Sequence, residues 1–224
     1  MEILKGLPVA QAINEELIKE SQEAGIKPHL AIIRVGERPD DCSYERGATK
    51  KMDKVGFDCT SYVFPQDITD EEFQKEFDKI NKDDNIDGIL LLRPLPKHLD
   101  EKAIENRIAS VKDLDGISPM NLAKVYAGDP TGYGPCTAEA VIEMLDYAGV
   151  DLKGKRAVVI GRSLVIGKPV AMMLMKKNAT VTVCHTKTVD MPGVCKGAEV
   201  LVAAAGVAKM VDKSFVADGA VVID

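Results

Sequence analysis

The sequence predicts an α/β protein with two α/β domains. Segments rich in β-branched residues alternate with segments of helical periodicity along most of the 224 residues, as in parallel βαβ construction. A passage rich in turn-forming residues interrupts this alternation past the middle of the chain, with Gly128, Pro130, Gly132 and Gly134 close together. We therefore expect a first domain at residues 1–120, a linker at 121–136 and a second domain at 137–224.

The first predicted domain alternates helices and strands. Apolar residues recur at helical spacing from Val9 to Glu23, and Gly25 closes that pattern. The segment 29–35 is an apolar strand that ends at Gly36. The elements that follow are a helix at 43–55, a strand at 60–64, an acidic helix at 70–82 and a strand at 88–92.

The second predicted domain repeats this alternation around one short strand. Residues 157–160 (Ala-Val-Val-Ile) are apolar on both faces, as a buried parallel strand should be, and Gly161 ends the run. A helix at 137–147 precedes this strand and another begins near Lys168. Further buried strands are expected at 179–184, 200–204 and 220–223.

Composition narrows the class of protein. The net charge of −6, the absence of a basic run and the few aromatic residues argue against a nucleic-acid surface. No signal-type segment opens the chain and no apolar stretch reaches membrane-spanning length, so we expect no membrane insertion. The five cysteines are scattered without a C-x-x-C pair, which argues against disulfides and a zinc site and favours the cytoplasm.

The turn after residue 160 is the strongest candidate site. Gly161, Ser163 and Gly167 let a backbone approach a pyrophosphate at the start of a helix, although the G-x5-G spacing departs from the usual G-x-G-x-x-G. A plain strand-turn-helix connection is the alternative. Arg162, inside the turn, would pair with a phosphate bidentately or else be a solvated surface residue.

Other candidates stand at the ends of predicted elements. Thr186 lies in the segment 185–188 after a buried strand, where dinucleotide folds grip the ribose, and the lack of an acidic residue there favours NADP over NAD. Tyr44 would point its hydroxyl into a cleft or simply pack. Asp115 would accept hydrogen bonds from a heterocycle or cap a turn. Cys136 precedes an N-capping Thr137 and is expected to be a packing residue rather than a nucleophile.

Five stretches carry a resemblance to a known family: IDGILLLRPLP, KDLDGISPMN, GPCTAEAV, VVIGRSLVIGKPVAMMLMKKNATVTVCHTKT and GAEVLVAAAG. Together they resemble the bifunctional methylenetetrahydrofolate dehydrogenase/cyclohydrolase family. The resemblance implies two α/β domains flanking a cleft, the second a Rossmann-like NADP-binding domain, in a cytoplasmic homodimer. It implies oxidation of 5,10-methylenetetrahydrofolate to the methenyl form with NADP, followed by hydrolysis to 10-formyltetrahydrofolate.

The same resemblance assigns residues to ligands. Tyr44 and Asp115 fall to the tetrahydrofolate substrate. The turn after residue 160 and Thr186, which follows the next predicted strand, are assigned to NADP, with Arg162 and Thr186 near its 2′-phosphate. The full set is Gly161, Arg162, Ser163, Gly167, Pro169 and Thr186.

The sequence also departs from the family pattern. Alanine at 48 stands where the family has its catalytic lysine, Leu92 replaces a glutamine, Arg93 a leucine and Asp41 a serine. We expect Lys51, which shares a helix face with Tyr44 and Ala48, to supply the missing ammonium, unless Lys50 and Lys51 are only a solvated pair. Strand alternation predicts that Arg93 points away from the face of Leu92.

Two alternatives follow from these departures. The protein would be a dehydrogenase without cyclohydrolase activity, or an inactive folate- or nucleotide-binding protein. The family pattern also continues past Asp224 with a strand, a glycine-rich loop and a helix, so the second domain is expected to lack its C-terminal elements.

Overall fold

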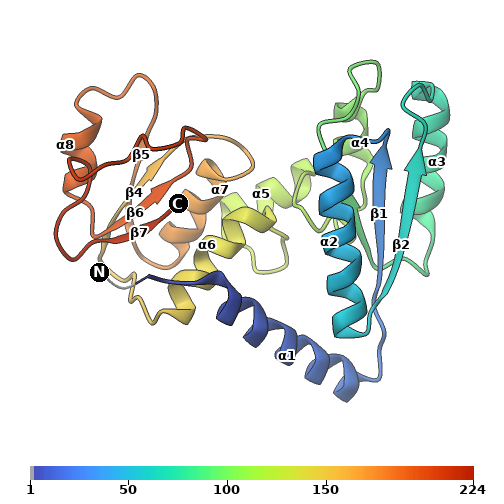
Figure 1. Cartoon of the computed structure of the whole chain (residues 1–224), viewed down its shortest axis with the longest axis horizontal. Helices are drawn as coiled ribbons and strands as arrows, with labels where there is room; N and C mark the ends of the chain where they lie inside the picture. The colour runs from blue at the N-terminus through green and yellow to red at the C-terminus, as the bar shows by residue number, and fades with distance from the viewer. Residues whose placement is uncertain (1–2) are drawn as a thin grey trace. The chain divides into compact units, whose positions relative to one another are not determined.

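The computed structural model describes residues 3–224, which divide into two compact units (Figure 1). One unit comprises residues 5–121, and the other comprises residues 122–224 together with residues 3 and 4. We call them the N-terminal unit and the C-terminal unit and describe each by itself.

The N-terminal unit is built on a parallel sheet in the order β2-β1-β3. Its strands are β1 (His29–Val35), β2 (Asp58–Phe64) and β3 (Gly88–Leu91). Its helices are α1 (Gly6–Ala24), α2 (Pro39–Val55), α3 (Asp70–Lys82) and α4 (Glu101–Arg107), and α5 (Pro119–Ala127) starts here and crosses into the C-terminal unit.

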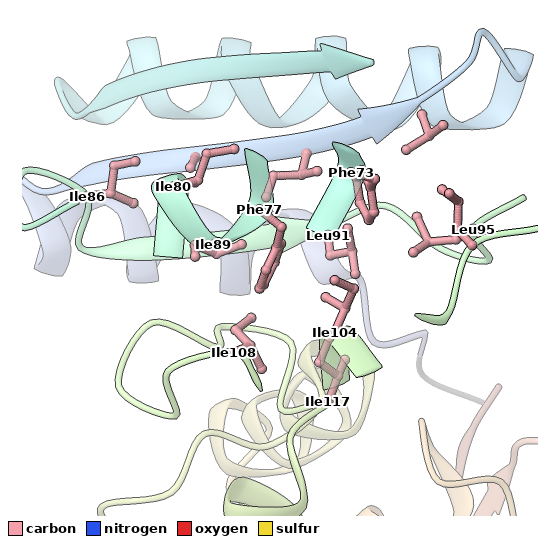
Figure 2. Packing of buried hydrophobic residues seen from close by; sticks show 14 residues of the cluster. Phe73, Phe77, Ile80, Ile86, Ile89, Leu91, Leu95, Ile104, Ile108 and Ile117 are labelled. Atoms are coloured by element: carbon pink, nitrogen blue, oxygen red, sulfur yellow. The ribbon is translucent and has the colours of Figure 1, made fainter. Parts of the chain in front are cut away.

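Helices cover both faces of this sheet. Leu30 and Ile32 of β1 pack toward α2, and the alternate residues Ala31 and Ile33 pack toward α3 and α4. Figure 2 shows Phe73, Phe77 and Ile80 of α3 directed at the strands, as expected for an amphipathic helix. Because β1 is central and buried on both faces, its residues 30–33 form a continuous apolar run rather than an alternating one.

The C-terminal unit holds a second parallel sheet in the order β5-β4-β6-β7. Its strands are β4 (Arg156–Ile160), β5 (Thr180–Cys184), β6 (Val200–Ala203) and β7 (Val221–Ile223). Helices α6 (Cys136–Tyr147) and α7 (Gly167–Lys176) pack on one face of β4, and α8 (Met191–Lys196) packs on the other.

The predicted α/β class and parallel construction are confirmed, and the differences lie in short helices. Helix α5 occupies the first part of the predicted linker, and its residue Asn121 is buried and bonded to Ser110 and Asp113 of the preceding loop. Helix α2 begins at Pro39 rather than at 43, because proline is well suited to the first turn. Helices α4 and α8, each shorter than most helices, were not predicted.

The described residues contain neither a membrane-spanning helix nor a cluster of metal-binding side chains. Within residues 3–224, no helix combines the length and apolar character that crossing a bilayer requires. In the same range, no group of three or more histidine, cysteine, aspartate or glutamate side chains is arranged to hold a metal ion.

Candidate active site

The turn between β4 and α7 is closed by two glycines that no other residue could replace without movement. Gly161 has φ +122°, and a Cβ there would lie 2.3 Å from the carbonyl oxygen of Ala204. A Cβ on Gly167 would lie 2.2 Å from the carbonyl oxygen of Gly161. The two glycines therefore bring strand β4, the segment after β6 and the start of α7 into close backbone contact, which gives the G-x5-G spacing a physical reason.

Ser163 has a structural role inside this turn. Its hydroxyl oxygen accepts hydrogen bonds from the backbone N–H groups of Ile166 (3.1 Å) and Gly167 (3.4 Å). Its carbonyl accepts from the N–H of Lys168 at 3.0 Å, and the next residue, Pro169, has no N–H. The first turn of α7 is thus largely capped from within, so an anion bound here depends on the turn backbone and on side chains more than on free α7 amides.

Arg162 and Thr186 follow neighbouring strands at the same edge of the sheet. Ile160 of β4 pairs with Cys184 of β5, and the Gly161 N–H donates to the Cys184 carbonyl at 2.9 Å. Arg162 and Thr186 each come two positions beyond that pair, and both are exposed. The carboxyl edge of a parallel sheet is where such folds bind ligands, so this edge is suited to an anionic cofactor.

The segment after β5 is itself a compact turn. The N–H of His185 donates to the Thr188 hydroxyl at 2.8 Å, and the N–H of Lys187 donates to His185 Nδ1 at 3.1 Å. This holds Thr186 and the exposed Lys187 outward at the carboxyl edge. A second cation therefore stands in the region where the sequence predicted a 2′-phosphate.

In the N-terminal unit, the predicted folate residues flank one apolar group that we call the α2 cluster. It joins helix α2, strand β1, the end of β3 and the loop after α4; its members are Leu30, Ile32, Ala48, Met52, Cys59, Leu90, Leu92 and Leu114. Tyr44 lies one helical turn before Ala48 and is 57% exposed, while Asp115 directly follows Leu114 and is half-buried. The segments carrying Tyr44 and Asp115 therefore meet at this cluster.

Lys51 also lies on α2, next to Met52 of the cluster. Lys51 is half-buried whereas its neighbour Lys50 is exposed, so the two lysines occupy different environments.

The loop that carries Asp115 is organised by Asp113. One carboxylate oxygen of Asp113 accepts from the N–H of Ile117 (3.0 Å), and the other accepts from the N–H of Ser118 (2.8 Å) and from Asn121 Nδ2 (2.9 Å). Asp113 therefore caps the turn that contains Asp115.

An ion pair joins β1 to α2 beside Tyr44. Arg34 Nε donates to Glu45 Oε2 at 2.6 Å, and the two side chains are only 11% and 14% exposed. Burial by itself would raise the pKa of Glu45, but hydrogen bonds from Ser61 and Arg34 outweigh it and hold that pKa below its ordinary value. Burial likewise opposes the charge of Arg34, and the hydrogen bond and charge of Glu45 leave its pKa raised.

Two family models match the chain almost end to end. The model described as "Tetrahydrofolate dehydrogenase/cyclohydrolase, catalytic domain" matches residues 4–115, and the model described as the NAD(P)-binding domain of the same enzymes matches residues 135–224. The chain belongs to the tetrahydrofolate dehydrogenase/cyclohydrolase family.

Individual relatives and solved structures are similar to this chain over almost its whole length. The bifunctional protein FolD of Clostridioides difficile is 53% identical, over all of this chain and 79% of its own length. The crystal structure of the FolD dehydrogenase/cyclohydrolase of Campylobacter jejuni superposes with a TM-score of 0.96 at 35% identity, over all of this chain and 80% of that one. The Trypanosoma brucei enzyme, solved with NADP and an inhibitor, gives 0.91 at 34% identity, over 99% and 77% of the two chains.

The departures from the family pattern have partners in the structure. Ala48 and Leu92, at the positions where the resemblance implies a lysine and a glutamine, both belong to the α2 cluster, so both are part of one apolar group. Arg93 Nη1 pairs with Glu105 (3.0 Å) and Glu101 (3.4 Å) of α4, which confirms that it points away from the face of Leu92.

The replacement at position 41 is also paired. The Asp41 carboxylate lies 3.5 Å from Arg38 Nε, and Arg38 Nη1 donates to the Pro94 carbonyl at 2.9 Å. Asp41 therefore helps to tie the start of α2 to the loop after β3, in a member of the family where a serine is usual.

Sequence reasoning missed the residues that hold the segments carrying Tyr44 and Asp115 in place. Asp113, Asn121, Arg34 and Glu45 bind no predicted ligand, and their partners are distant or irregular in spacing. The available clue was a charged residue inside an otherwise apolar run, Arg34 in His29–Val35, because such a charge needs a partner.

Of the cysteines, Cys184 and Cys195 are buried together. Burial, and then Cys184, raises the pKa of the Cys195 thiol to about 12, which makes it a poor nucleophile.

Proposed function

We propose that the protein oxidises 5,10-methylenetetrahydrofolate to 5,10-methenyltetrahydrofolate with NADP and hydrolyses the product to 10-formyltetrahydrofolate, as an enzyme of one-carbon metabolism. The observation that carries this proposal is the 53% identity to a bifunctional FolD protein across the entire chain. The two alternatives, an inactive folate- or nucleotide-binding protein and a dehydrogenase without cyclohydrolase activity, gain no support, since the relatives are named bifunctional proteins.

The C-terminal unit fits NADP. The glycine turn leaves no room for a Cβ at Gly161 or Gly167, as expected where backbone must approach a pyrophosphate. Bound there, NADP would supply the hydride acceptor. Arg162, with Thr186 and Lys187 on the adjacent turn, would hold the 2′-phosphate, while Ser163 and Pro169 would fix the backbone of the turn.

The N-terminal unit is proposed to bind and orient the folate. The Asp115 carboxylate accepts hydrogen bonds from the amino groups of the heterocycle, and the exposed Tyr44 offers it an aromatic face and a hydroxyl. The α2 cluster beneath them, with Ala48 and Leu92, provides an apolar and rigid base. Positioning of this kind is the main demand of hydride transfer.

Hydrolysis makes a different demand, because a water must be activated and a nitrogen protonated. We propose that Lys51 meets it: the residue shares a helix face with Tyr44 and Ala48 and is half-buried. Side chains in helices lean toward the N-terminus, so its ammonium would reach past a residue as small as alanine. The cytoplasmic location and the homodimer implied by the resemblance stay predictions.

Both activities can be tested on the purified protein. Incubation with 5,10-methylenetetrahydrofolate and NADP should produce NADPH absorbance, and 10-formyltetrahydrofolate should then accumulate. Binding of both ligands without NADPH formation would show that the proposed function is wrong.

Lys51→Met tests the proton-transfer assignment, with the exposed neighbour Lys50→Met as the matched control. We expect Lys51→Met to slow methenyltetrahydrofolate hydrolysis by about 10²-fold or more, the usual contribution of general acid-base catalysis, and to keep most of the hydride transfer. Lys50→Met should change neither rate. Unchanged hydrolysis in Lys51→Met would exclude Lys51 from catalysis.

A further inference from the structure

The loop at residues 112–118 is irregular, yet it is fixed at several points. The N–H of Ile89 in β3 donates to the Lys112 carbonyl at 2.6 Å. The Lys112 ammonium donates to the carbonyls of Asp83 (2.7 Å) and Asn81 (3.1 Å) at the end of α3. These bonds hold the entrance to the loop against β3 and α3.

The next residue, Asp113, holds the rest of the loop. Its side chain is 1% exposed and accepts from the backbone of Ile117 and Ser118 and from the amide of Asn121. Asn121 is itself fully buried, and its Nδ2 also donates to the Ser110 carbonyl at 2.9 Å. The carboxylate therefore joins the two ends of the turn that contains Asp115.

The donor set requires a carboxylate at this position. Each oxygen of Asp113 accepts a backbone N–H, so an amide would place its NH₂ group against an N–H donor in either orientation. No described ion pair includes Asp113, so the negative charge is stabilised by N–H donors rather than by a neighbouring cation.

Leu114 shows how little freedom the loop has between Asp113 and Asp115. A Cβ on Gly88 at the start of β3 would lie 2.3 Å from Leu114 Cδ1, so the leucine side chain sits directly on the β3 backbone. Leu114 also packs in the α2 cluster. The bonds that join Asp113 to Ile117 and Ser118 and the packing of Leu114 therefore fix the backbone that carries Asp115.

We propose that Asp113, with Asn121, is a positioning residue that aims Asp115 at the folate heterocycle. The inference rests on the proposed function, which assigns Asp115 to the substrate. Asp113 touches no ligand in this scheme: it acts through the loop backbone, and its loss should weaken folate binding only as far as Asp115 contributes to that binding.

The test is a double-mutant cycle of Asp113→Asn and Asp115→Ala, read by calorimetric titration with tetrahydrofolate and, separately, with NADP. We expect each single variant to weaken tetrahydrofolate binding about tenfold or more, because each disturbs hydrogen bonds to a charged group. The double variant should bind within about twofold of Asp115→Ala alone, and the NADP dissociation constant should stay within about twofold in all variants.

A merely structural role predicts a different pattern. Losses that multiply in the double variant, or equal losses for tetrahydrofolate and NADP, would overturn the inference. Thr69→Ala is the control for general destabilisation, since it removes the α3 capping box in the same unit without touching the loop; it should lower the melting temperature and leave both constants unchanged.

A replacement variant covers a folding failure, and the binding of wild-type protein separates failure of this inference from failure of the proposed function. If Asp113→Asn does not fold, the milder Asn121→Ser, which removes donors to Asp113 and Ser110, takes its place in the same cycle with the same criteria. Wild-type protein that binds tetrahydrofolate normally while Asp113→Asn binds equally well would overturn the inference alone. Wild-type protein that does not bind tetrahydrofolate would overturn the proposed function with it.

Discussion

Gly161→Ala should damage both the fold of the C-terminal unit and its cofactor site. The backbone at Gly161 has φ +122°, a conformation that L residues rarely adopt, and the new Cβ would meet the Ala204 carbonyl at 2.3 Å. The turn cannot easily move away, because the Gly161 N–H is bonded to Cys184 and the Ala204 N–H to Ile160 (2.8 Å).

The magnitude follows from these two contributions. A strained backbone conformation costs about 1–3 kcal/mol, and one displaced backbone hydrogen bond costs about 1 kcal/mol more, so we expect a loss of about 2–4 kcal/mol in unfolding free energy. For a chain of this length, that loss corresponds to a melting temperature lower by roughly 5–15 °C. Gly149→Ala is the matched control: φ there is +67° and no atom lies within 4 Å of the added Cβ, so only conformational strain is introduced.

Thermal melting with and without NADP is the assay. At a concentration of about 100 times its dissociation constant, NADP should stabilise the wild type and Gly149→Ala by about 2.7 kcal/mol, and Gly161→Ala by much less. If Gly161→Ala melts like Gly149→Ala and gains the full stabilisation from NADP, the close approach at Gly161 is not what the turn requires.

Two other predictions concern charges. Arg162→Ala should weaken NADP binding about tenfold or more and leave NAD binding unchanged, since a charge-assisted hydrogen bond to the 2′-phosphate contributes about 1.5–3 kcal/mol; equal losses for both cofactors would contradict this. The lowered pKa of Glu45 means that the unfolded state binds more protons than the folded state near and below pH 4.5, so its stabilising contribution is full above that range and is lost as pH falls. Urea unfolding at pH 6 and pH 3.5 should therefore show a smaller acid destabilisation in Glu45→Gln than in wild type, and identical pH dependence would exclude the contribution of this carboxylate.

Local patterns predicted those elements whose reasons are local. Helix α3 was predicted with its observed bounds, Asp70–Lys82, and the structure shows two local reasons for them: an apolar face at helical spacing, and a capping box formed by Thr69 and Glu72. The glycine turn was also recognisable, since a short β-branched run that stops at a glycine is typical of a buried strand entering a turn. Helix α5 was missed because Asn121 is polar, and its buried bonds to Asp113 and Ser110 follow no periodicity.

The residues of the candidate site fall into two similar groups, those that could be selected from the sequence and those that only the fold reveals. Residues that resemble the family's motif, such as Tyr44, Asp115 and Arg162, were selected from sequence, whereas their supports became visible only in the fold. Ala48 and Leu92 are far apart in the chain, and only the parallel pairing of β1 with β3 beneath α2 shows that they share one cluster.

That shared cluster changes the meaning of the departures at positions 48 and 92. A lysine at 48 facing a leucine at 92 would place an ammonium against apolar side chains without the amide oxygen that a glutamine supplies, which is costly unless the charge escapes to water. Apolar residues at both positions avoid that cost, and Arg34 and Glu45 form a largely buried ion pair that joins β1 to α2 about one turn nearer the start of the helix. The apolar pair at positions 48 and 92 therefore favours tight packing of α2 on the sheet, and the half-buried Lys51 lies on α2 next to Met52 of that cluster.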